Sequence, residues 1–165
     1  MTGLPAFNRL DPAEAAAVLR PCLDVDRWVD TIVARRPYAG FDDLLETAEH
    51  AANPLTGAEL ESALAHHPRI GQEAAGSTTE AALSRSEQGG LALDERVQTR
   101  LVEGNRAYEQ RFGRVFLIRA AGRSTEEILS ALEIRLRNDP HTEDKVVADQ
   151  LRQIALLRLA QAVTR

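Results

Sequence analysis

Two adjacent histidines, His66 and His67, are the first residues whose type and placement could support acid–base chemistry. They stand in the stretch ALAHHPRIGQ, at the expected end of a helix that runs to Pro68. A proline disfavours helical geometry in the residue before it, so His67 is expected in the last helical turn or just beyond. An imidazole there can face a cavity and act as an acid or a base. The alternative is a core histidine that hydrogen-bonds to a backbone carbonyl, and the pattern alone leaves both interpretations open.

The phase of that helix separates the two imidazoles. A capping box that begins at Thr56 marks the first helical turn. Leu60, Leu64 and His67 then fall at i, i+4 and i+7 on one apolar stripe. His66 lies on the polar side of the helix. The sequence therefore predicts that His67 points inward and that His66 points to solvent.

A hydroxyl, a carboxylate and an amide share one face of the next expected helix, residues 77–89. Ser84, Glu87 and Gln88 stand at i, i+3 and i+4, where helical side chains are neighbours. Polar groups on an otherwise small and apolar face are costly unless they find partners, and a ligand or His67 could supply these. The alternative is a solvated face with a local side-chain network.

An arginine interrupts the apolar stripe of the last expected helix, which follows Pro140. A guanidinium on a buried stripe needs an anion or a set of carbonyl groups around it. Arg158 could therefore pair with a structural carboxylate, such as Glu133 or Glu143. Its functional interpretation is a planar fork that holds a carbonyl-rich or carboxylate substrate. The stripe consists of Leu151, Ile154, Ala155 and Ala162.

Other reaction chemistries lack their minimum residues. The sequence contains no HExxH, CxxC or GxSxG motif and no Walker or Rossmann glycine pattern. Adjacent residues on a helix diverge by about 100°, so His66 and His67 cannot easily converge on one metal ion. Cys22, the single cysteine, has no evident partner that would activate it. We expect neither a metal site nor a nucleotide site.

Composition indicates one domain, residues 1–165, in a reducing, cytoplasmic setting. The chain is long enough to bury a core without disulfides, and Cys22 alone cannot form an internal one. No apolar run approaches the roughly 20 residues that span a bilayer, and the N-terminus lacks a signal-peptide pattern, so no membrane partner is expected. A net charge of −5, from 20 basic and 25 acidic residues, opposes binding to nucleic acid but allows a small anionic substrate near a buried arginine.

Capping signals and helical periodicity predict an all-α fold of about eight helices. The run VFLIRA, between Gly113 and Gly122, is the one segment that could be extended, and a single strand makes no sheet. The expected helices cover residues 11–23, 25–36, 41–52, 56–68, 77–89, 92–113, 124–138 and 142–163.

Several stretches of the sequence belong together as a pattern. They are DRWVDTIVARRPYAGFDDLL, HHPRIG, SRSEQGGL, NRAYEQRFGRVFLIRAAGRS, EIRLRND and LRQIALLRL. In this order they closely resemble the family of OHCU decarboxylases of uric acid degradation, where OHCU is 2-oxo-4-hydroxy-4-carboxy-5-ureidoimidazoline. Each stretch is a weak signal alone, but together they cover nearly the whole chain.

The resemblance implies a cofactor-free, all-α enzyme that decarboxylates OHCU to (S)-allantoin and CO2 and forms a homodimer. It also implies that His67 is the catalytic histidine and that Glu87 is its acidic partner. Ile118 would contribute through backbone groups of the FLI segment. We expect the site residues, which come from distant parts of the chain, to open onto one pocket. The residues expected to bind substrate are Pro68, Ser84, Gln88, Ile118 and Arg158.

Two other functions remain open at this point. One is a cofactor-free lyase or isomerase that acts on a related ureide ring with the same pocket. The other is a non-catalytic helical module that binds purine-breakdown intermediates or a partner protein, and the pairing of His67 with Glu87 argues against it. Turnover of OHCU and the optical activity of its product separate the three.

Overall fold

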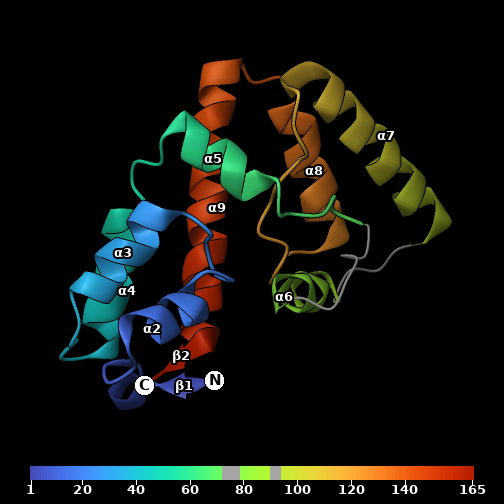
Figure 1. The fold of residues 1–165 in the computed structure, drawn as a ribbon. Coiled ribbons are helices and arrows are strands. Elements are labelled where there is room, and N and C mark those ends of the chain that lie inside the picture. Colours follow the sequence, from blue (N-terminus) through green and yellow to red (C-terminus); the bar gives the residue numbers. More distant parts are fainter. Residues whose placement is uncertain (72–78, 90–93) are drawn as a thin grey trace. The chain divides into compact units, whose positions relative to one another are not determined.

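The structure is a computed structural model that describes residues 1–71, 79–89 and 94–165. This part of the chain forms nine α-helices and only two strands of two residues each (Figure 1). The all-α class that the sequence predicts is therefore confirmed. None of the helices in these residues is both long enough and apolar enough to cross a bilayer.

Contacts along the backbone divide the described chain into two compact units. The first unit comprises Met1–Ala63 and Arg152–Arg165, and the second comprises Leu64–Leu151. The last helix, α9 (Pro140–Ala162), begins in the second unit and ends in the first. The expectation of a single domain over residues 1–165 remains a prediction.

The first unit is built from short helices, and α2 shows how a capping box begins one of them. The elements that begin in this unit are β1 (Thr2–Gly3), α1 (Leu4–Phe7), α2 (Pro12–Leu19), α3 (Asp26–Ala34), α4 (Phe41–Ala51), α5 (Gly57–Leu64) and β2 (Val163–Thr164). At the start of α2 the Asp11 carboxylate accepts a hydrogen bond from the Glu14 amide at 2.8 Å, and the Glu14 carboxylate accepts one from the Asp11 amide at 3.2 Å. This reciprocal pair satisfies two amides that the helix leaves unbonded.

Helices α3 and α4 pack around one tryptophan. Trp28 on α3 is fully buried, and its indole Nε1 donates to the Ala48 carbonyl on α4 at 2.9 Å. A buried indole N–H needs a partner, so this bond fixes how the two helices approach. Val29 and Ile32 are fully buried too, as the helical spacing of these apolar residues predicts.

The two ends of the chain lie side by side (Figure 1). Strand β1 pairs in parallel with β2, so that Thr2 lies beside Val163 and Gly3 beside Thr164. Neither strand is predictable from sequence periodicity, because two residues carry no period and their pairing joins opposite ends of the chain.

Two capping boxes predicted from the sequence begin α5 and the helix α8 (Thr125–Arg135). In the first, the Thr56 amide donates to Glu59 Oε2 at 2.8 Å, and the Glu59 amide donates to Thr56 Oγ1 at 3.2 Å. Ser124 and Glu127 form the same reciprocal pair at distances of 2.6 and 3.2 Å. The box predicted at Ser77 lies outside the described residues.

Helix α5 ends at Leu64, before the predicted end at Pro68. Residues 65–66 form a turn, and the His67 amide donates to the Leu64 carbonyl at 3.0 Å. This i to i+3 bond tightens the last turn, so the chain leaves the helix ahead of the proline.

The second unit surrounds an apolar core. It contains α6 (Thr79–Gln88), α7 (Glu95–Phe112), α8 and the start of α9. Helices α7 and α8 approach closely at Gly104, where an added Cβ would clash with Leu132 Cδ2. Helix α7 ends at Phe112 and is capped by Gly113, whose φ of +70° lies in the left-handed region that glycine favours. The core side chains are Ile70, Leu101, Tyr108, Phe116, Ile118, Ala120, Ile128, Leu129 and Leu132.

The run 115–120 forms neither helix nor strand, so the prediction that it makes no sheet is confirmed. Two side chains hold its backbone instead. Arg135 Nη1 donates to the Leu117 carbonyl at 2.7 Å, and the Arg119 amide donates to Gln150 Oε1 at 3.0 Å. Side chains thus supply hydrogen bonds that a neighbouring strand would otherwise provide.

Candidate active site

The two adjacent histidines lie just after α5 and differ in exposure. His67 is half-buried, whereas His66 is exposed. Burial therefore confirms the predicted difference between the two imidazoles, and His67 lies just beyond the helix, as expected for the residue before Pro68. Pro68 is also half-buried. The candidate catalytic imidazole is thus sheltered from bulk solvent but still accessible.

The polar face predicted on α6 is turned partly inward. Ser84 is only 4% exposed, and Glu87 and Gln88 are half-buried. This burial is inconsistent with a fully solvated face, which was the alternative that the sequence left open. It places a carboxylate and an amide where the low local dielectric strengthens their interactions.

Gln88 connects α6 to the segment that follows the candidate catalytic histidine. Its Oε1 atom accepts a hydrogen bond from the Gly71 amide at 2.9 Å. The amide oxygen of Gln88 therefore supports the backbone just beyond His67, and its NH2 group is the end with donors for a substrate carbonyl. The sequence predicts Gln88 as a substrate-binding residue and does not reveal this second contact.

Residues 69–71 are also tied to α7. Arg69 forms a bidentate ion pair with Glu109, in which Nη2 lies 2.9 Å from Oε2 and Nε contacts Oε1. Asn105 Nδ2 donates to the Ile70 carbonyl at 3.0 Å. The hydrogen bonds from Arg69 lower the pKa of the Glu109 carboxyl below its ordinary value. None of these partners is evident from sequence motifs, because they join segments that are far apart in the chain.

Ile118 lies in the apolar core of the second unit, as does Ile70. Its side chain is 6% exposed. A contribution of Ile118 to a polar pocket would therefore come from its backbone groups, as the resemblance implies. The next amide along the chain, that of Arg119, is bonded to Gln150.

A buried network fixes the run that contains Ile118. The side chains of Arg135 and Glu143 form an ion pair with an Nη2 to Oε1 distance of 2.6 Å, and they are 6% and 0% exposed. The Tyr108 hydroxyl donates to Glu143 Oε1 at 2.6 Å, and Asn138 Nδ2 donates to Oε2 at 2.9 Å. Burial, followed by the bond to Glu143, raises the pKa of Tyr108 to about 12. Glu143 is therefore the carboxylate partner of Arg135 and not of Arg158, for which it was a candidate from the sequence.

Arg158 lies in the first unit, on the part of α9 that ends there. It is 2% exposed, so the prediction of a buried arginine on this stripe is confirmed. Its Nη1 group donates to the Pro21 carbonyl at 3.2 Å. Because Arg158 and His67 belong to different units, their expected meeting in one pocket remains a prediction. The other expected residues all lie in the second unit.

No three metal-binding side chains cluster within the residues that the structure describes. The protein is thus all-α, with half-buried polar side chains at His67, just after α5, and at Glu87 and Gln88 on α6. The sequence profile of the OHCU decarboxylase family matches residues 8–160. The chain belongs to the OHCU decarboxylase family.

Relatives with known names support this membership. A 2-oxo-4-hydroxy-4-carboxy-5-ureidoimidazoline decarboxylase from Amia calva is 31% identical over 131 residues, which are 78% of this chain and 75% of that protein. A protein of the same name from Haloferax volcanii is 27% identical over 96% of this chain and 94% of its own length. A uric acid degradation bifunctional protein from Bacillus sp. (strain TB-90) is 24% identical over 98% of this chain, which spans only 32% of that longer relative.

Solved structures share the fold. An (S)-allantoin synthase superposes with a TM-score of 0.74 at 17% identity, over 99% of this chain and 54% of the other. An OHCU decarboxylase crystallised in the presence of (S)-allantoin superposes with a TM-score of 0.67 at 24% identity, over 85% of this chain and 92% of the other.

Proposed function

We propose that this chain is a carboxy-lyase of uric acid degradation that decarboxylates OHCU to (S)-allantoin and CO2. The family match over residues 8–160 is the observation that carries the assignment, because it includes every residue of the expected site. The half-buried His67 and the inward-turned face of α6 support it, since both provide polar groups sheltered from water.

The substrate contains its own electron sink, so the proposed reaction requires no cofactor. The carbon that loses CO2 is adjacent to a ring C=N bond, and the released electron pair can move into that imine. The protein then needs only to bind the substrate, orient the scissile bond and handle protons. Loss of CO2 is fastest when the breaking bond lies perpendicular to the ring plane, where it aligns with the π-system.

Proton transfer is assigned to His67 and Glu87. His67 lies near the hydroxyl and carboxylate of the substrate as an acid or base, and Glu87 hydrogen-bonds to it or to the substrate and sets its protonation state. The intermediate is then protonated on one face only. That step determines the chirality of the product, because OHCU decays without help to racemic allantoin.

Binding and orientation are assigned to the remaining residues. The Arg158 guanidinium and the NH2 group of Gln88 donate to the carbonyl and ureido groups of the substrate. The oxygen of Gln88 accepts from the Gly71 amide, which fixes the orientation of the side chain and supports the assignment of its NH2 group to the substrate. Ser84 adds a hydroxyl, while Pro68 and the backbone of Ile118 form the wall of the pocket.

The working form is proposed to be a cytoplasmic homodimer. The dimer follows from the resemblance to the family, and the reducing compartment follows from the single cysteine, Cys22. Size-exclusion chromatography with light scattering checks the dimer directly.

One assay tests the assignment. OHCU is generated in place from urate, the protein is added, and the circular dichroism of the allantoin formed is followed. We expect faster decay of OHCU and an excess of the (S) form. His67→Asn should lose turnover by at least about a hundredfold, the lower range for an acid–base group. Racemic product at the uncatalysed rate with the unaltered chain would overturn the proposal.

Arg158→Lys is the matching test of substrate binding. A lysine retains the charge but cannot reproduce the planar fork, so KM should rise while the circular dichroism of the protein stays helical. Unchanged kinetics would make Arg158 a structural residue only.

A further inference from the structure

One peptide bond in the second unit is held at both ends by side-chain amides. Asn105 Nδ2, on α7, donates to the Ile70 carbonyl at 3.0 Å. Gln88 Oε1, on α6, accepts from the Gly71 amide at 2.9 Å. This carbonyl and this N–H belong to the same trans peptide, in which they point in opposite directions. The orientation of that peptide therefore couples the side chain of Asn105 to the side chain of Gln88.

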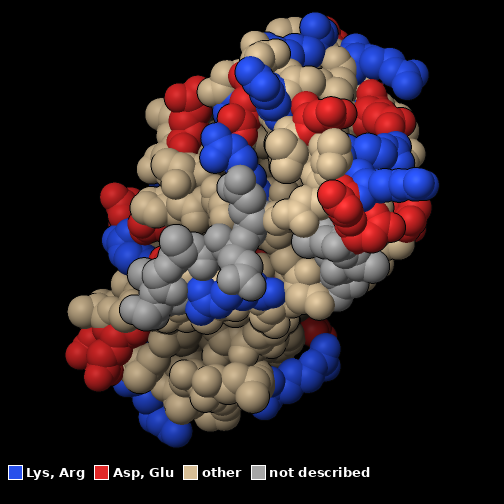
Figure 2. All heavy atoms as spheres, turned by 90° about the vertical axis from the view of Figure 1, so that its right-hand side faces the viewer, with Lys and Arg blue, Asp and Glu red and all other residues tan. Residues whose placement is uncertain are grey.

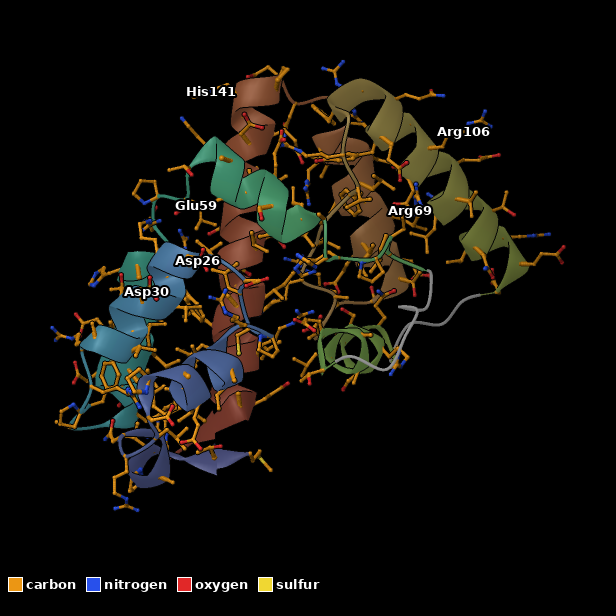
Figure 3. All side chains as sticks on the ribbon, viewed as in Figure 1. Asp26, Asp30, Glu59, Arg69, Arg106 and His141 are labelled. Carbon is orange, nitrogen blue, oxygen red and sulfur yellow. The ribbon has the colours of Figure 1, made fainter. Side chains whose placement is uncertain are left out.

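Burial distinguishes Asn105 from the other contact that this segment makes with α7. Asn105 is 5% exposed, whereas its neighbour Arg106 projects outward from α7 (Figure 3). The ion pair of Arg69 with Glu109 is partly exposed to water and salt. Basic and acidic side chains are also intermingled on the face of the molecule that carries α7 (Figure 2). The bond from Asn105 to Ile70 is buried, so neither solvent nor other charges compete for it.

Packing alone does not explain an amide at position 105. The bond to the Ile70 carbonyl identifies the nitrogen of this amide, because only nitrogen can donate to a carbonyl. Oδ1 is buried and accepts no hydrogen bond from the residues that the structure describes. A buried acceptor without a donor lowers stability, and an apolar side chain of similar size, such as leucine, would avoid that loss. The donor of Asn105 therefore indicates a role other than stability.

Gly71 allows the peptide to keep this orientation. Its φ of +84° lies in the left-handed region, where a side chain would be strained. Rotation of the peptide between residues 70 and 71 would bring φ to a negative value, but it would reverse both the carbonyl and the N–H. An added Cβ would also lie 3.2 Å from Leu101 Cδ1. Glycine at position 71 and an amide at position 105 thus favour the same peptide orientation.

We propose that Asn105 is a positioning residue for Gln88. It acts through the peptide between Ile70 and Gly71, which fixes the Gln88 side chain so that its NH2 group donates to the carbonyl or ureido group of the substrate. Along these three amides each hydrogen bond is donated towards Gln88, so each polarises the next and strengthens the last donor. Substrate binding then need not order this side chain. The inference rests on the proposed function, because it takes OHCU as the ligand of Gln88.

The kinetics of OHCU decay test the inference. Asn105→Leu removes the donor at similar volume, so KM should rise about threefold to tenfold, the effect of ordering one side chain on binding. A purely structural role would lower the amount of folded enzyme and leave KM unchanged. Gln98→Leu removes an exposed amide from the same helix and should keep the KM of the unaltered chain. An unchanged KM in folded Asn105→Leu would overturn the inference.

A double-mutant cycle tests the route through Gln88. Gln88→Leu removes the amide on which Asn105 acts, so adding Asn105→Leu to it should raise KM no further. Gly71→Ala favours the rotated peptide and leaves Asn105 in place, so it provides a second test should Asn105→Leu not fold. It should raise KM by a similar factor and have no further effect in Gln88→Leu. Additive effects, or an unchanged KM in Gly71→Ala, would contradict the proposal.

Hydrogen exchange of the Gly71 amide tests the same contacts without the reaction. In Asn105→Leu this amide should exchange about threefold to tenfold faster, the effect of weakening one hydrogen bond, and in Gln98→Leu it should exchange as in the unaltered chain. Unchanged exchange in Asn105→Leu would overturn the inference. Absence of OHCU turnover in the unaltered chain would instead overturn the proposed function, and faster exchange in Asn105→Leu would still show that Asn105 orients the peptide that Gln88 binds.

Discussion

Two arginine–carboxylate pairs in the second unit have the same chemistry and very different surroundings. In the pair of Arg135 with Glu143, the side chains are 6% and 0% exposed. In the pair of Arg69 with Glu109, they are 46% and 27% exposed. Both arginines use two nitrogens, but Arg135 places both on Glu143 Oε1, whereas Arg69 uses both oxygens of Glu109.

The buried pair supports the run that contains Ile118, and the exposed pair supports the segment that directly follows His67 and Pro68. The buried pair holds the run 115–120 through the Leu117 carbonyl, whereas the exposed pair holds residues 69–71 against α7. Loss of one buried partner leaves an uncompensated charge in the interior, but at the surface water and salt replace the missing partner. Burial, rather than the number of hydrogen bonds, therefore decides how strongly each pair stabilises its segment.

The largest expected effect follows from neutralising the buried carboxylate. Glu143→Gln should lower the free energy of unfolding by about 3–5 kcal/mol, because the Arg135 guanidinium then remains buried without a counter-charge. Urea unfolding followed by circular dichroism measures the loss. Glu133→Gln is the matched control, because Glu133 pairs with Arg100, both side chains are 56% exposed, and the pair should contribute about 1 kcal/mol or less. Equal losses in both variants would contradict the argument from burial.

A smaller effect is expected from the hydroxyl that completes the buried network. Tyr108→Phe removes the donor that lies 2.6 Å from Glu143 Oε1 and leaves the ring in place. A hydrogen bond to a charged group contributes about 2 kcal/mol, so the variant should be less destabilised than Glu143→Gln. A double-mutant cycle of the two changes measures their coupling. Strictly additive losses would show that the hydroxyl and the carboxylate act independently.

The exposed pair should respond to salt. Arg69→Gln is expected to change the midpoint of urea unfolding only slightly, and the difference from the unaltered chain should shrink further at high ionic strength. Arg100→Gln provides the control, because Arg100 pairs with Glu133 and both side chains are 56% exposed. If Arg69→Gln lowered the free energy of unfolding as much as Glu143→Gln does, and salt did not change the loss, the two pairs would not differ in the way that burial predicts.

The smallest effect is a shift in the titration of one carboxyl. Arg69 lowers the pKa of Glu109, so the stabilisation from this pair is present above the ordinary glutamate pKa of about 4.3. It is lost as the pH falls through the lowered pKa, when the folded chain also takes up the proton. A ¹³C titration of Glu109 should show the lowered pKa, and Arg69→Gln should raise it towards the ordinary value. The same pKa in both chains would contradict the assignment.

Much of the helical framework and part of the site are predictable from the sequence. The capping boxes at Asp11 and Ser124 begin helices as expected, because their hydrogen bonds join residues three apart. The burial of Arg158 follows from helical phase. The different exposure of the two histidines agrees with the prediction, although both lie beyond the end of α5. The early end of α5 is not predictable, because a turn stabilised by one i to i+3 bond competes with continued helix ahead of Pro68.

The sequence does not predict which side chains pair when they lie far apart along the chain. Glu143 was a reasonable partner for Arg158 on the basis of charge alone, yet its carboxylate binds Arg135, Tyr108 and Asn138. Many carboxylates are compatible with one arginine in a linear sequence. Only the packing of α7, α8 and α9 brings one of them within hydrogen-bond distance.

The sequence by itself determined the helical class, most helix starts and the burial of Arg158, because these depend on contacts within a few turns of one helix. Only the tertiary structure decided that Gln88 holds Gly71 and that Arg69 holds Glu109, partners that lie 17 and 40 residues apart. The physical reason is that such contacts depend on how separate helices pack, and side-chain spacing along one helix does not specify that packing.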